Sequence, residues 1–250
     1  MTLKEKLRSR ELVLGCFIKT PHPVVVEVLG MTDLDCLVLD AEHAPFDRSA
    51  LDACILGARA AGKDILVRPQ CSSPEHILNA LDLGATGVLL PHIRSAAVAA
   101  AALHACHYGA GGRGYAGSTR AAGYTTHGLS RTRAEALDVA VIAQIEDVDA
   151  LDQIDAIAAD DRIDALFVGR ADLTVALGAD GPDATEVVGA VERICSAASE
   201  AGRCVGMFLS RQEDVALWRS KGASLFLMSS DHEFLLKGAS ALREKVSGRR

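Results

Sequence analysis

The sequence lacks any long uninterrupted apolar run, although 49% of its 250 residues are hydrophobic. A membrane-spanning helix needs roughly 18 or more consecutive apolar residues, so none is expected. The N-terminal stretch MTLKEKLRSRELVLG alternates charged and apolar residues, and it therefore lacks the continuous apolar segment of a secretory signal. These two absences predict a soluble protein of the cytoplasm.

The sequence also lacks a basic patch and a C-x-x-C pair. Its formal net charge is −7 and its basic residues are scattered, which argues against a nucleic-acid surface and favours small-molecule partners. Several of the seven cysteines lie inside apolar runs. We therefore expect reduced, buried thiols and neither a disulfide framework nor a zinc site. A catalytic cysteine is disfavoured, since free cysteine usually behaves as a small core residue.

Short β-rich runs recur along the whole chain. They are mostly continuous apolar runs, as expected of strands covered on both faces in a parallel sheet. The runs are 12–18, 36–40, 64–69, 87–93, 139–146, 165–170, 204–210 and 224–230. This alternation, without a break in composition, predicts one α/β domain over residues 1–250 with the fold of a closed (β/α)8 TIM barrel. A doubly wound open sheet is the alternative.

Helical patterns fill the intervals between these runs. In residues 47–62, apolar side chains recur at three- and four-residue spacings, with Asp47 placed as an N-cap and Gly62 as a stop. The same pattern predicts further helices within residues 72–84, 185–202 and 211–222.

One connection is longer than this scheme requires. Residues 107–138 form a glycine-rich stretch between the helix after the fourth strand and the fifth strand. Long insertions in compact domains are usually functional, so we expect a mobile flap or an interface segment there.

Polar residues gather where the predicted strands end. In (β/α)8 barrels the active site lies at the carboxyl ends of the strands, so residues at these positions carry most weight. The polar residues found there are Asp40, Glu42, His43, Arg68, His92, Gln144, Glu146 and Asp172. We therefore expect one end of the barrel to form a catalytic mouth.

Two of these carboxylates could bind a cation together. Glu146 and Asp172 follow neighbouring strands, which lie about 4.8 Å apart in a sheet. Two oxygen ligands would leave Mg²⁺ or Mn²⁺ with open positions for water and a chelating substrate. Alternatively, Glu146 begins a helix and Asp172 caps one, and the residue pattern leaves both interpretations open.

His43 and Arg68 carry the other chemical hypotheses. His43 could act as a general base, with Asp40 or another carboxylate fixing its tautomer, or it could be a hydrogen-bonded turn histidine. Arg68 could stabilise an enolate or hold a keto-acid oxygen, or it could form a surface salt bridge. We favour the catalytic roles because these residues occur together, whereas His92 is expected to be structural.

The strand ends also show what is missing. Runs 204–210 and 224–230 are not followed by the glycine-rich loops that often hold phosphate in barrels, so a phosphorylated substrate is disfavoured. A Schiff-base aldolase needs a desolvated lysine at the mouth, but only Lys19 follows a strand. Metal-assisted enolisation fits better, with the free N–H groups of Ala171 and Asp172 at a helix start as a seat for a substrate carboxylate.

The ordered motifs of the chain resemble the HpcH/HpaI family of metal-dependent class II pyruvate aldolases. This family includes 4-hydroxy-2-oxoheptanedioate aldolase and 2-dehydro-3-deoxyglucarate aldolase, with citrate lyase β subunits as distant relatives. The resemblance covers nearly the whole chain and is carried by D-x-EHAP at 40–45, LVRP at 66–69, LDLGATGVLLPHIRSA at 81–96, GGRG at 111–114, QIE at 144–146 and VGRADLTVALG at 168–178. It implies a homo-oligomer, either a trimer or a hexamer.

The resemblance also implies catalytic roles. His43 would be the acid/base, and Arg68 would steady the developing enolate. Asp82 resembles the family aspartate that raises the basicity of this histidine, in some members across a subunit boundary. Asp40 completes the expected catalytic set.

Ligand-binding roles follow in the same way. The resemblance implies Glu146 and Asp172 as ligands of a divalent cation, Mg²⁺, Mn²⁺ or Co²⁺. Gln144 and the backbone of Ala171 and Asp172 would hold the keto acid together with Arg68.

The chain departs from the family pattern at two places. Gly-Arg, ending in Arg170, replaces the usual Gly-Pro before A-D-L, and Phe46 stands where asparagine is frequent. We expect both changes to lie near the substrate and to affect the choice of aldehyde. Arg113 and Arg120 are candidates for binding an acidic group on that aldehyde, or they are exposed to solvent.

The implied activity is that of a carbon–carbon lyase. It would reversibly cleave a 4-hydroxy-2-oxo acid to pyruvate and an aldehyde, as in the catabolism of aromatic or sugar acids. A citryl- or malyl-CoA-type lyase is an alternative that the acidic charge balance disfavours, because the CoA phosphates need a basic groove. A non-catalytic keto-acid-binding subunit is the other alternative.

Overall fold

The computed structural model describes residues 1–248, and its centre is a closed barrel of parallel strands. Each strand pairs with the next one along the chain, and β8 pairs with β1. The strands are β1 (Val13–Ile18), β2 (Cys36–Asp40), β3 (Asp64–Arg68), β4 (Gly87–Leu90), β5 (Ala140–Ile145), β6 (Ala165–Val168), β7 (Cys204–Leu209) and β8 (Ala223–Ser230). The predicted strands and the (β/α)8 barrel are confirmed, and the pairing of β8 with β1 excludes the open sheet.

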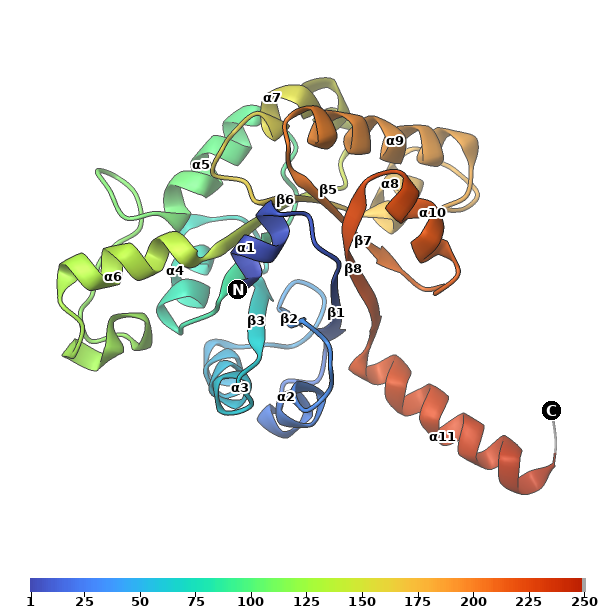
Figure 1. The fold of residues 1–250 in the computed structure, drawn as a ribbon, viewed down its shortest axis with the longest axis horizontal. Coiled ribbons are helices and arrows are strands. Elements are labelled where there is room, and N and C mark those ends of the chain that lie inside the picture. The colour runs from blue at the N-terminus through green and yellow to red at the C-terminus, as the bar shows by residue number, and fades with distance from the viewer. Residues whose placement is uncertain (249–250) are drawn as a thin grey trace.

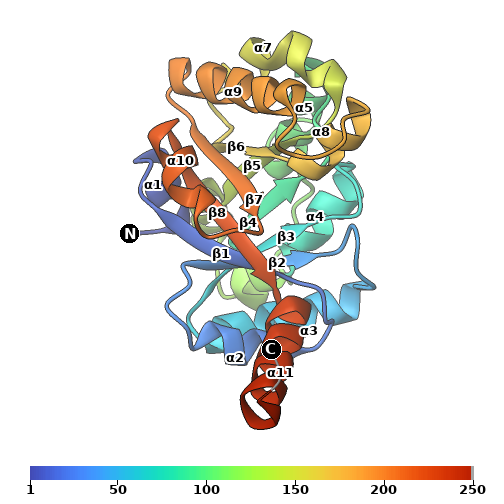
Figure 2. The same cartoon turned by 90° about the vertical axis from the view of Figure 1, so that its right-hand side faces the viewer.

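Helices surround this barrel (Figures 1 and 2). The helices around it are α2 (Pro23–Gly30), α3 (Arg48–Ala60), α4 (Pro74–Asp82), α5 (Ala96–Cys106), α7 (Ile154–Ala158), α9 (Thr185–Glu200) and α10 (Asp214–Ser220), and α11 (Asp231–Ser247) follows β8. A short additional helix, α8 (Arg170–Ala176), lies between β6 and α9. The Asp47 side chain accepts a hydrogen bond from the Ala50 N–H at 2.7 Å, and Gly62 has a φ of +64°, so α3 begins and ends as predicted.

Two apolar layers form the core. One fills the barrel and includes Val38, Leu66, Ile142, Phe167 and Leu227. The other lies between the barrel and the helices and contains the alternate strand residues. This division follows from the twofold periodicity of side chains along a strand.

The N-terminal helix α1 (Leu3–Arg8) closes one end of the barrel. Its Leu3 and Leu7 belong to the interior apolar layer. Buried Asp164, which precedes β6, accepts a hydrogen bond from Arg8 Nε at 2.7 Å and lies 3.3 Å from Lys4 Nζ. The opposite end, where the strands finish, is left free for the polar residues that follow them.

Residues 107–138 lie at the end of the barrel that α1 closes. They contain the 3-10 helices η1 (Arg120–Thr125) and η2 (Ala136–Asp138) and the helix α6 (Leu129–Glu135). With Thr2, Asp64 and Thr86, they line a cavity of about 510 Å³ at the beginnings of the strands. The segment therefore does not cover the mouth of its own chain.

The C-terminal helix α11 extends away from the barrel (Figure 1). Asp231 anchors its first turn, since the carboxylate accepts hydrogen bonds from the N–H groups of Lys19 and Thr20 at 2.7 and 3.0 Å. It is also the one buried residue in the helix. Across the described chain, 1–248, no helix combines the length and apolar character needed to cross a membrane.

The cysteines behave largely as predicted. All seven are free, and each except Cys71 is buried. Burial raises the pKa of Cys16 and Cys106 to about 12, so these thiols stay protonated at neutral pH.

Candidate active site

The register of β2 and β3 brings Asp40 and Arg68 side by side. The two residues are direct partners in the parallel ladder, and each ends its strand. Asp40 Oδ1 accepts a hydrogen bond from Arg68 Nε at 3.0 Å and lies 2.8 Å from Arg68 Nη2, while Lys19 Nζ lies 2.8 Å from Oδ2. Burial opposes ionisation of Asp40, but Arg68 and Lys19 outweigh it and hold the pKa of this carboxyl below its usual value. Asp40 is therefore an anion that fixes two cations at the mouth.

Further contacts hold the Arg68 guanidinium in place. Its carbon lies 4.7 Å from the centre of the Phe17 ring, and Nη1 lies 3.3 Å from Glu42 Oε2. With a side chain only 8% exposed, Arg68 keeps a fixed positive charge at the barrel rim, as predicted.

His43 lies at the same rim. Its side chain is 55% exposed, and Nε2 lies 3.7 Å from Glu42 Oε2. Asp40 accepts a hydrogen bond from the backbone N–H of His43 at 3.1 Å and not from its ring. Asp40 therefore positions the turn that carries His43, which differs from the expectation that it would orient the imidazole.

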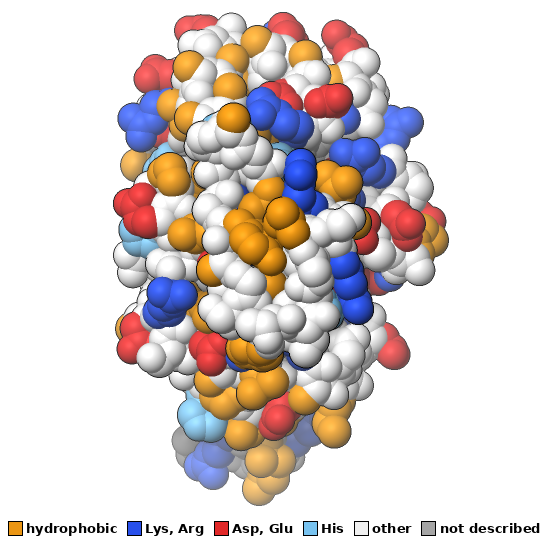
Figure 3. Space-filling view, turned by 90° about the vertical axis from the view of Figure 1, so that its left-hand side faces the viewer, with side chains coloured by type: hydrophobic (Ala, Val, Ile, Leu, Met, Phe, Trp, Pro, Cys, Tyr) orange, Lys and Arg blue, Asp and Glu red, His pale blue; other side chains and the backbone are white. Residues whose placement is uncertain are grey.

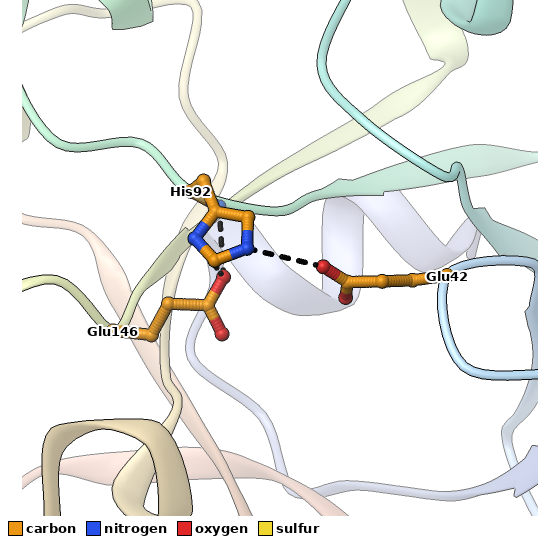
Figure 4. Close-up of side chains that lie close together, drawn as sticks. All are labelled: Glu42, His92 and Glu146. Carbon is orange, nitrogen blue, oxygen red and sulfur yellow. Dashed lines mark hydrogen bonds and ion pairs between the residues drawn. The ribbon is translucent and has the colours of Figure 1, made fainter. Parts of the chain in front are cut away.

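Glu42, His92 and Glu146 form a cluster that was not predicted from the sequence (Figure 4). His92 Nε2 lies 3.3 Å from Glu42 Oε1, and His92 Nδ1 lies 3.5 Å from Glu146 Oε1. One donor atom from each residue lies within 4.8 Å of the other two. His92, expected to be structural, has a left-handed backbone (φ +54°), and its N–H donates to Glu146 Oε1 at 2.8 Å.

The cluster carries an excess of negative charge. Burial raises the pKa of Glu42, and the Glu146 carboxylate adds to this rise against the effect of Arg68. Burial opposes protonation of His92, but Asp147 and the two glutamates outweigh it and raise the pKa of His92 above its ordinary value. A divalent cation would balance this charge, and carboxylate oxygens with an imidazole nitrogen suit such ions.

Glu146 is fixed by its neighbours. Gln144 Nε2 donates a hydrogen bond to Glu146 Oε2, which leaves Gln144 Oε1 buried and without a partner in the described chain. Glycine is required at 169, because a Cβ there would lie 2.6 Å from Glu146 Cβ and 2.9 Å from Oε2. The unpaired amide oxygen and the constrained carboxylate indicate a site prepared for a ligand.

A cavity of about 320 Å³ joins most of the predicted site residues. Its polar lining residues are Lys19, His43, Arg68, Gln144, Arg170 and Asp172, and its apolar side is formed by Phe17, Phe167 and Phe208. Ala171 also lines it, and the described chain supplies no acceptor for the N–H groups of Ala171 and Asp172. Glu146 does not line the cavity itself but accepts a hydrogen bond from Gln144, which does. Asp172 lines the cavity directly and does not belong to the cluster of Glu42, His92 and Glu146.

Four predicted residues lie elsewhere in the chain. Asp82, at the end of α4, accepts a hydrogen bond from Arg113 Nη2 at 2.6 Å. Arg120 donates a hydrogen bond to the Leu83 carbonyl and pairs with an aspartate on α3. Arg113 and Arg120 were candidates for binding the aldehyde, but neither of them lines the cavity. Phe46 was expected near the substrate, but it packs in the layer between barrel and helices because an apolar ring is most stable there.

Comparisons with known proteins show which sequences and structures this chain resembles. The sequence model of the HpcH/HpaI aldolase/citrate lyase family matches residues 13–237. The chain is 32% identical to a hydroxypyruvate/pyruvate aldolase of Paraburkholderia phytofirmans, covering 98% of this chain and 96% of that protein. It is 31% identical to a 5-keto-4-deoxy-D-glucarate aldolase of Klebsiella pneumoniae, covering 91% and 90%. A crystal structure of an HpcH/HpaI aldolase/citrate lyase family protein from Burkholderia cenocepacia superposes with a TM-score of 0.92 at 30% identity, covering 98% of both chains.

Proposed function

We propose that this chain, which belongs to the HpcH/HpaI aldolase/citrate lyase family, is a metal-dependent pyruvate aldolase. It reversibly cleaves a 4-hydroxy-2-oxo acid into pyruvate and an aldehyde. One observation carries the proposal: a single cavity is lined by His43, Arg68, Gln144 and Asp172. These side chains supply a base, a fixed cation, an amide and a carboxylate, which an aldol cleavage requires together.

Glu146 and Asp172 hold the divalent cation in this proposal, with Mg²⁺, Mn²⁺ and Co²⁺ as the candidate ions. When bound, the ion polarises the keto group and compensates negative charge on its oxygen. Glu42 and His92 also lie close to Glu146, but this proposal does not assign them as ligands. Gln144 and the N–H groups of Ala171 and Asp172 bind the keto acid.

The remaining steps belong to the side chains at the rim. A ring nitrogen of His43 accepts the proton of the 4-hydroxyl group, and the bond between C3 and C4 then breaks to release the aldehyde. Arg68 stabilises the negative charge that develops on the pyruvate enolate until C3 is protonated. Asp40 positions both residues through the Arg68 guanidinium and the His43 backbone.

Asp82 serves the site of a neighbouring subunit in this proposal. It pairs with Arg113 of the 107–138 segment, away from the mouth cavity of its own chain.

The 107–138 segment exposes Tyr115, Tyr124, Leu129 and Leu137. Figure 3, which views the side of the molecule where α6 lies, shows hydrophobic side chains gathered in the middle of that face. Exposed apolar patches of this kind support a homo-oligomer, for which the family resemblance implies a trimer or a hexamer.

The seven free cysteines support a cytoplasmic location.

Pyruvate release tests the function. Purified protein is incubated with a panel of 4-hydroxy-2-oxo acids after EDTA treatment, and Mg²⁺, Mn²⁺ or Co²⁺ is then added back. We expect turnover that depends on the added ion, with Arg68→Lys lowering kcat on the order of 10²-fold or more because its fork of donors is lost. Absence of metal-dependent turnover across the panel would favour a non-catalytic keto-acid-binding subunit.

A direct metal titration tests the ligands. Binding of Mn²⁺ is measured by calorimetry for Glu146→Gln, Asp172→Asn and His92→Asn. The proposal predicts that the first two variants lose about 10-fold or more in affinity, while His92→Asn retains binding close to that of the unmodified protein. The reverse order for Asp172 and His92 would assign the ion to the cluster in Figure 4.

A further inference from the structure

A second cavity adjoins the mouth of the barrel. Its volume is about 410 Å³, and with the mouth cavity of about 320 Å³ it falls in the range of small-molecule sites. Both cavities are lined by Arg170, Ala171 and Phe208. The other lining residues of the second cavity are Thr174, Asp180, Gly181, Pro182 and Ser210. A substrate that reacts beside His43 therefore has room for its far end beyond Phe208.

Arg170 brings a positive charge that is only partly balanced. The residue is 9% exposed, and its Nε is buried and unpartnered within residues 1–248. Its Nη2 donates to the Pro182 carbonyl at 2.9 Å and to Asp183 Oδ1 at 3.2 Å. Arg211 holds both oxygens of the same Asp183 carboxylate, at 3.2 and 3.1 Å. Because two guanidinium groups share one anion, Arg170 has capacity for another.

The guanidinium is also held in position. Its carbon lies 5.1 Å from the centre of the Trp218 ring, which is buried on α10. A stacked guanidinium loses little conformational freedom when it binds a planar anion such as a carboxylate. Asp180 is the acidic lining residue of the second cavity, but it is exposed, so solvent screens its charge more than that of Arg170.

The geometry points to Arg170 as the residue that selects the aldehyde, by binding a carboxylate at the end of the aldehyde opposite the reacting carbonyl group. This inference rests on the proposed aldolase function. An aldehyde with an anionic end offsets the part of the Arg170 charge that the shared Asp183 carboxylate leaves unbalanced, whereas an aldehyde with an apolar end does not. The substrate class is therefore a 4-hydroxy-2-oxo acid with a second carboxylate at its far end.

Condensation of pyruvate with two aldehydes of equal length tests the selection. Succinic semialdehyde ends in a carboxylate and butyraldehyde ends in a methyl group. For Arg170→Gln we expect the ratio of kcat/KM for succinic semialdehyde to that for butyraldehyde to fall about 10- to 100-fold, with the KM for pyruvate unchanged. Arg170→Lys keeps the charge but loses the fork, so its ratio lies between those of Arg170→Gln and the unmodified protein.

Arg211→Gln is the matched control. Arg211 binds the same Asp183 but lines neither cavity, so the ratio stays that of the unmodified protein. Two results overturn the inference: an equal loss for both aldehydes in Arg170→Gln and Arg170→Lys, or the same change of ratio in Arg211→Gln. Either result would mean that Arg170 holds the loop of Pro182 and Asp183 and does not bind the substrate.

Tryptophan fluorescence gives a readout that needs no turnover. Trp218 is the single tryptophan of the chain, and Arg170 stacks on it. Titration with succinic semialdehyde should change its fluorescence saturably in the unmodified protein, but not in Arg170→Gln, and butyraldehyde should have no effect on either. If the unmodified protein joins neither aldehyde to pyruvate, the proposed function fails while this titration still decides whether Arg170 binds the carboxylate. An identical titration in Arg170→Gln overturns the inference.

Discussion

At the scale of single residues, the site depends on close packing as much as on charge. Gly169 lets the Glu146 carboxylate stand against the first turn of α8, where Asp172 also lies. Any side chain at 169 would displace Glu146 from the position that Gln144 and the His92 N–H define. A residue without functional groups thus controls where a charged residue points.

Gly169→Ala should therefore lower metal affinity and activity by about 10- to 100-fold, the range typical of disturbing the partners of a ligand. Calorimetric Mn²⁺ binding and pyruvate release measure the effect. Gly189→Ala is the control, because a Cβ at this position on α9 meets nothing within 4 Å. Equal behaviour of the two variants would contradict the packing argument.

His107 makes stability depend on pH. Burial lowers the pKa of His107 below its ordinary value of 6.5, and Lys4 and Arg162 add to this effect against Asp164 and Asp160. The unfolded chain then binds the proton more readily than the folded chain does. The stability contributed by neutral His107 is present above pH 6.5 and is lost as pH falls through the lowered folded value.

His107→Gln should therefore weaken the loss of stability between about pH 7.5 and pH 5.5. Urea unfolding at several pH values provides the measurement, and His104→Gln, at an exposed position on α5, is the control. An unchanged pH dependence in His107→Gln would show that other groups determine it.

At the scale of elements, α1 closes the barrel at the end away from the chemistry. Leu7 is 0% exposed and lies in the interior apolar layer. Leu7→Ala should reduce the free energy of unfolding by about 2–5 kcal/mol, since it leaves a cavity at the barrel end. Leu12→Ala, at a site 41% exposed, should change it by less than about 1 kcal/mol. Urea denaturation of both variants tests this, and similar losses would argue against α1 as a packed plug.

The strands and helices could be predicted from the sequence because their signals are local. Continuous apolar runs such as 36–40 and 204–210 have no other use in a protein that folds in water, and caps such as Asp47 act within one turn. The residues that follow the carboxyl ends of the strands could be placed together at one end of the barrel, because the strand ends themselves could be predicted. Arg68, His43, Gln144 and Asp172 do line one cavity.

The sequence could not predict contacts that depend on backbone direction or on distant elements. His92 Nε2 lies 3.3 Å from Glu42 Oε1 and the residue has a φ of +54°, and a left-handed histidine has no local signature in the sequence. Phe46 was placed near the substrate because it lies close to His43 in sequence. Its ring packs instead in the layer of the core between the barrel and the helices.

At the scale of the whole molecule, α11 leaves a large apolar surface in contact with solvent. Leu235, Leu236, Leu242 and Val246 are 66%, 70%, 65% and 75% exposed. Soluble chains rarely expose such surfaces without a partner, which supports the proposed homo-oligomer.

Replacing Leu235 and Leu236 together by aspartate should therefore shift the protein toward a smaller species, because charges would be buried at the contact. Sedimentation velocity measures the change. Lys245→Asp, which adds negative charge to an exposed position of the same helix, should leave the assembly intact. A protein that sediments as a monomer without any substitution would contradict the proposal.

Residues 107–138 lie at the end of the barrel opposite the mouth, so sequence changes in this segment and sequence changes at the mouth affect different properties of the protein. Insertions or deletions in this stretch can change how copies associate, and through Arg113 the position of Asp82, while the side chains that line the mouth cavity of the same chain stay where they are. New aldehyde preferences, in contrast, would have to arise at the other pole, among the few side chains around Phe208.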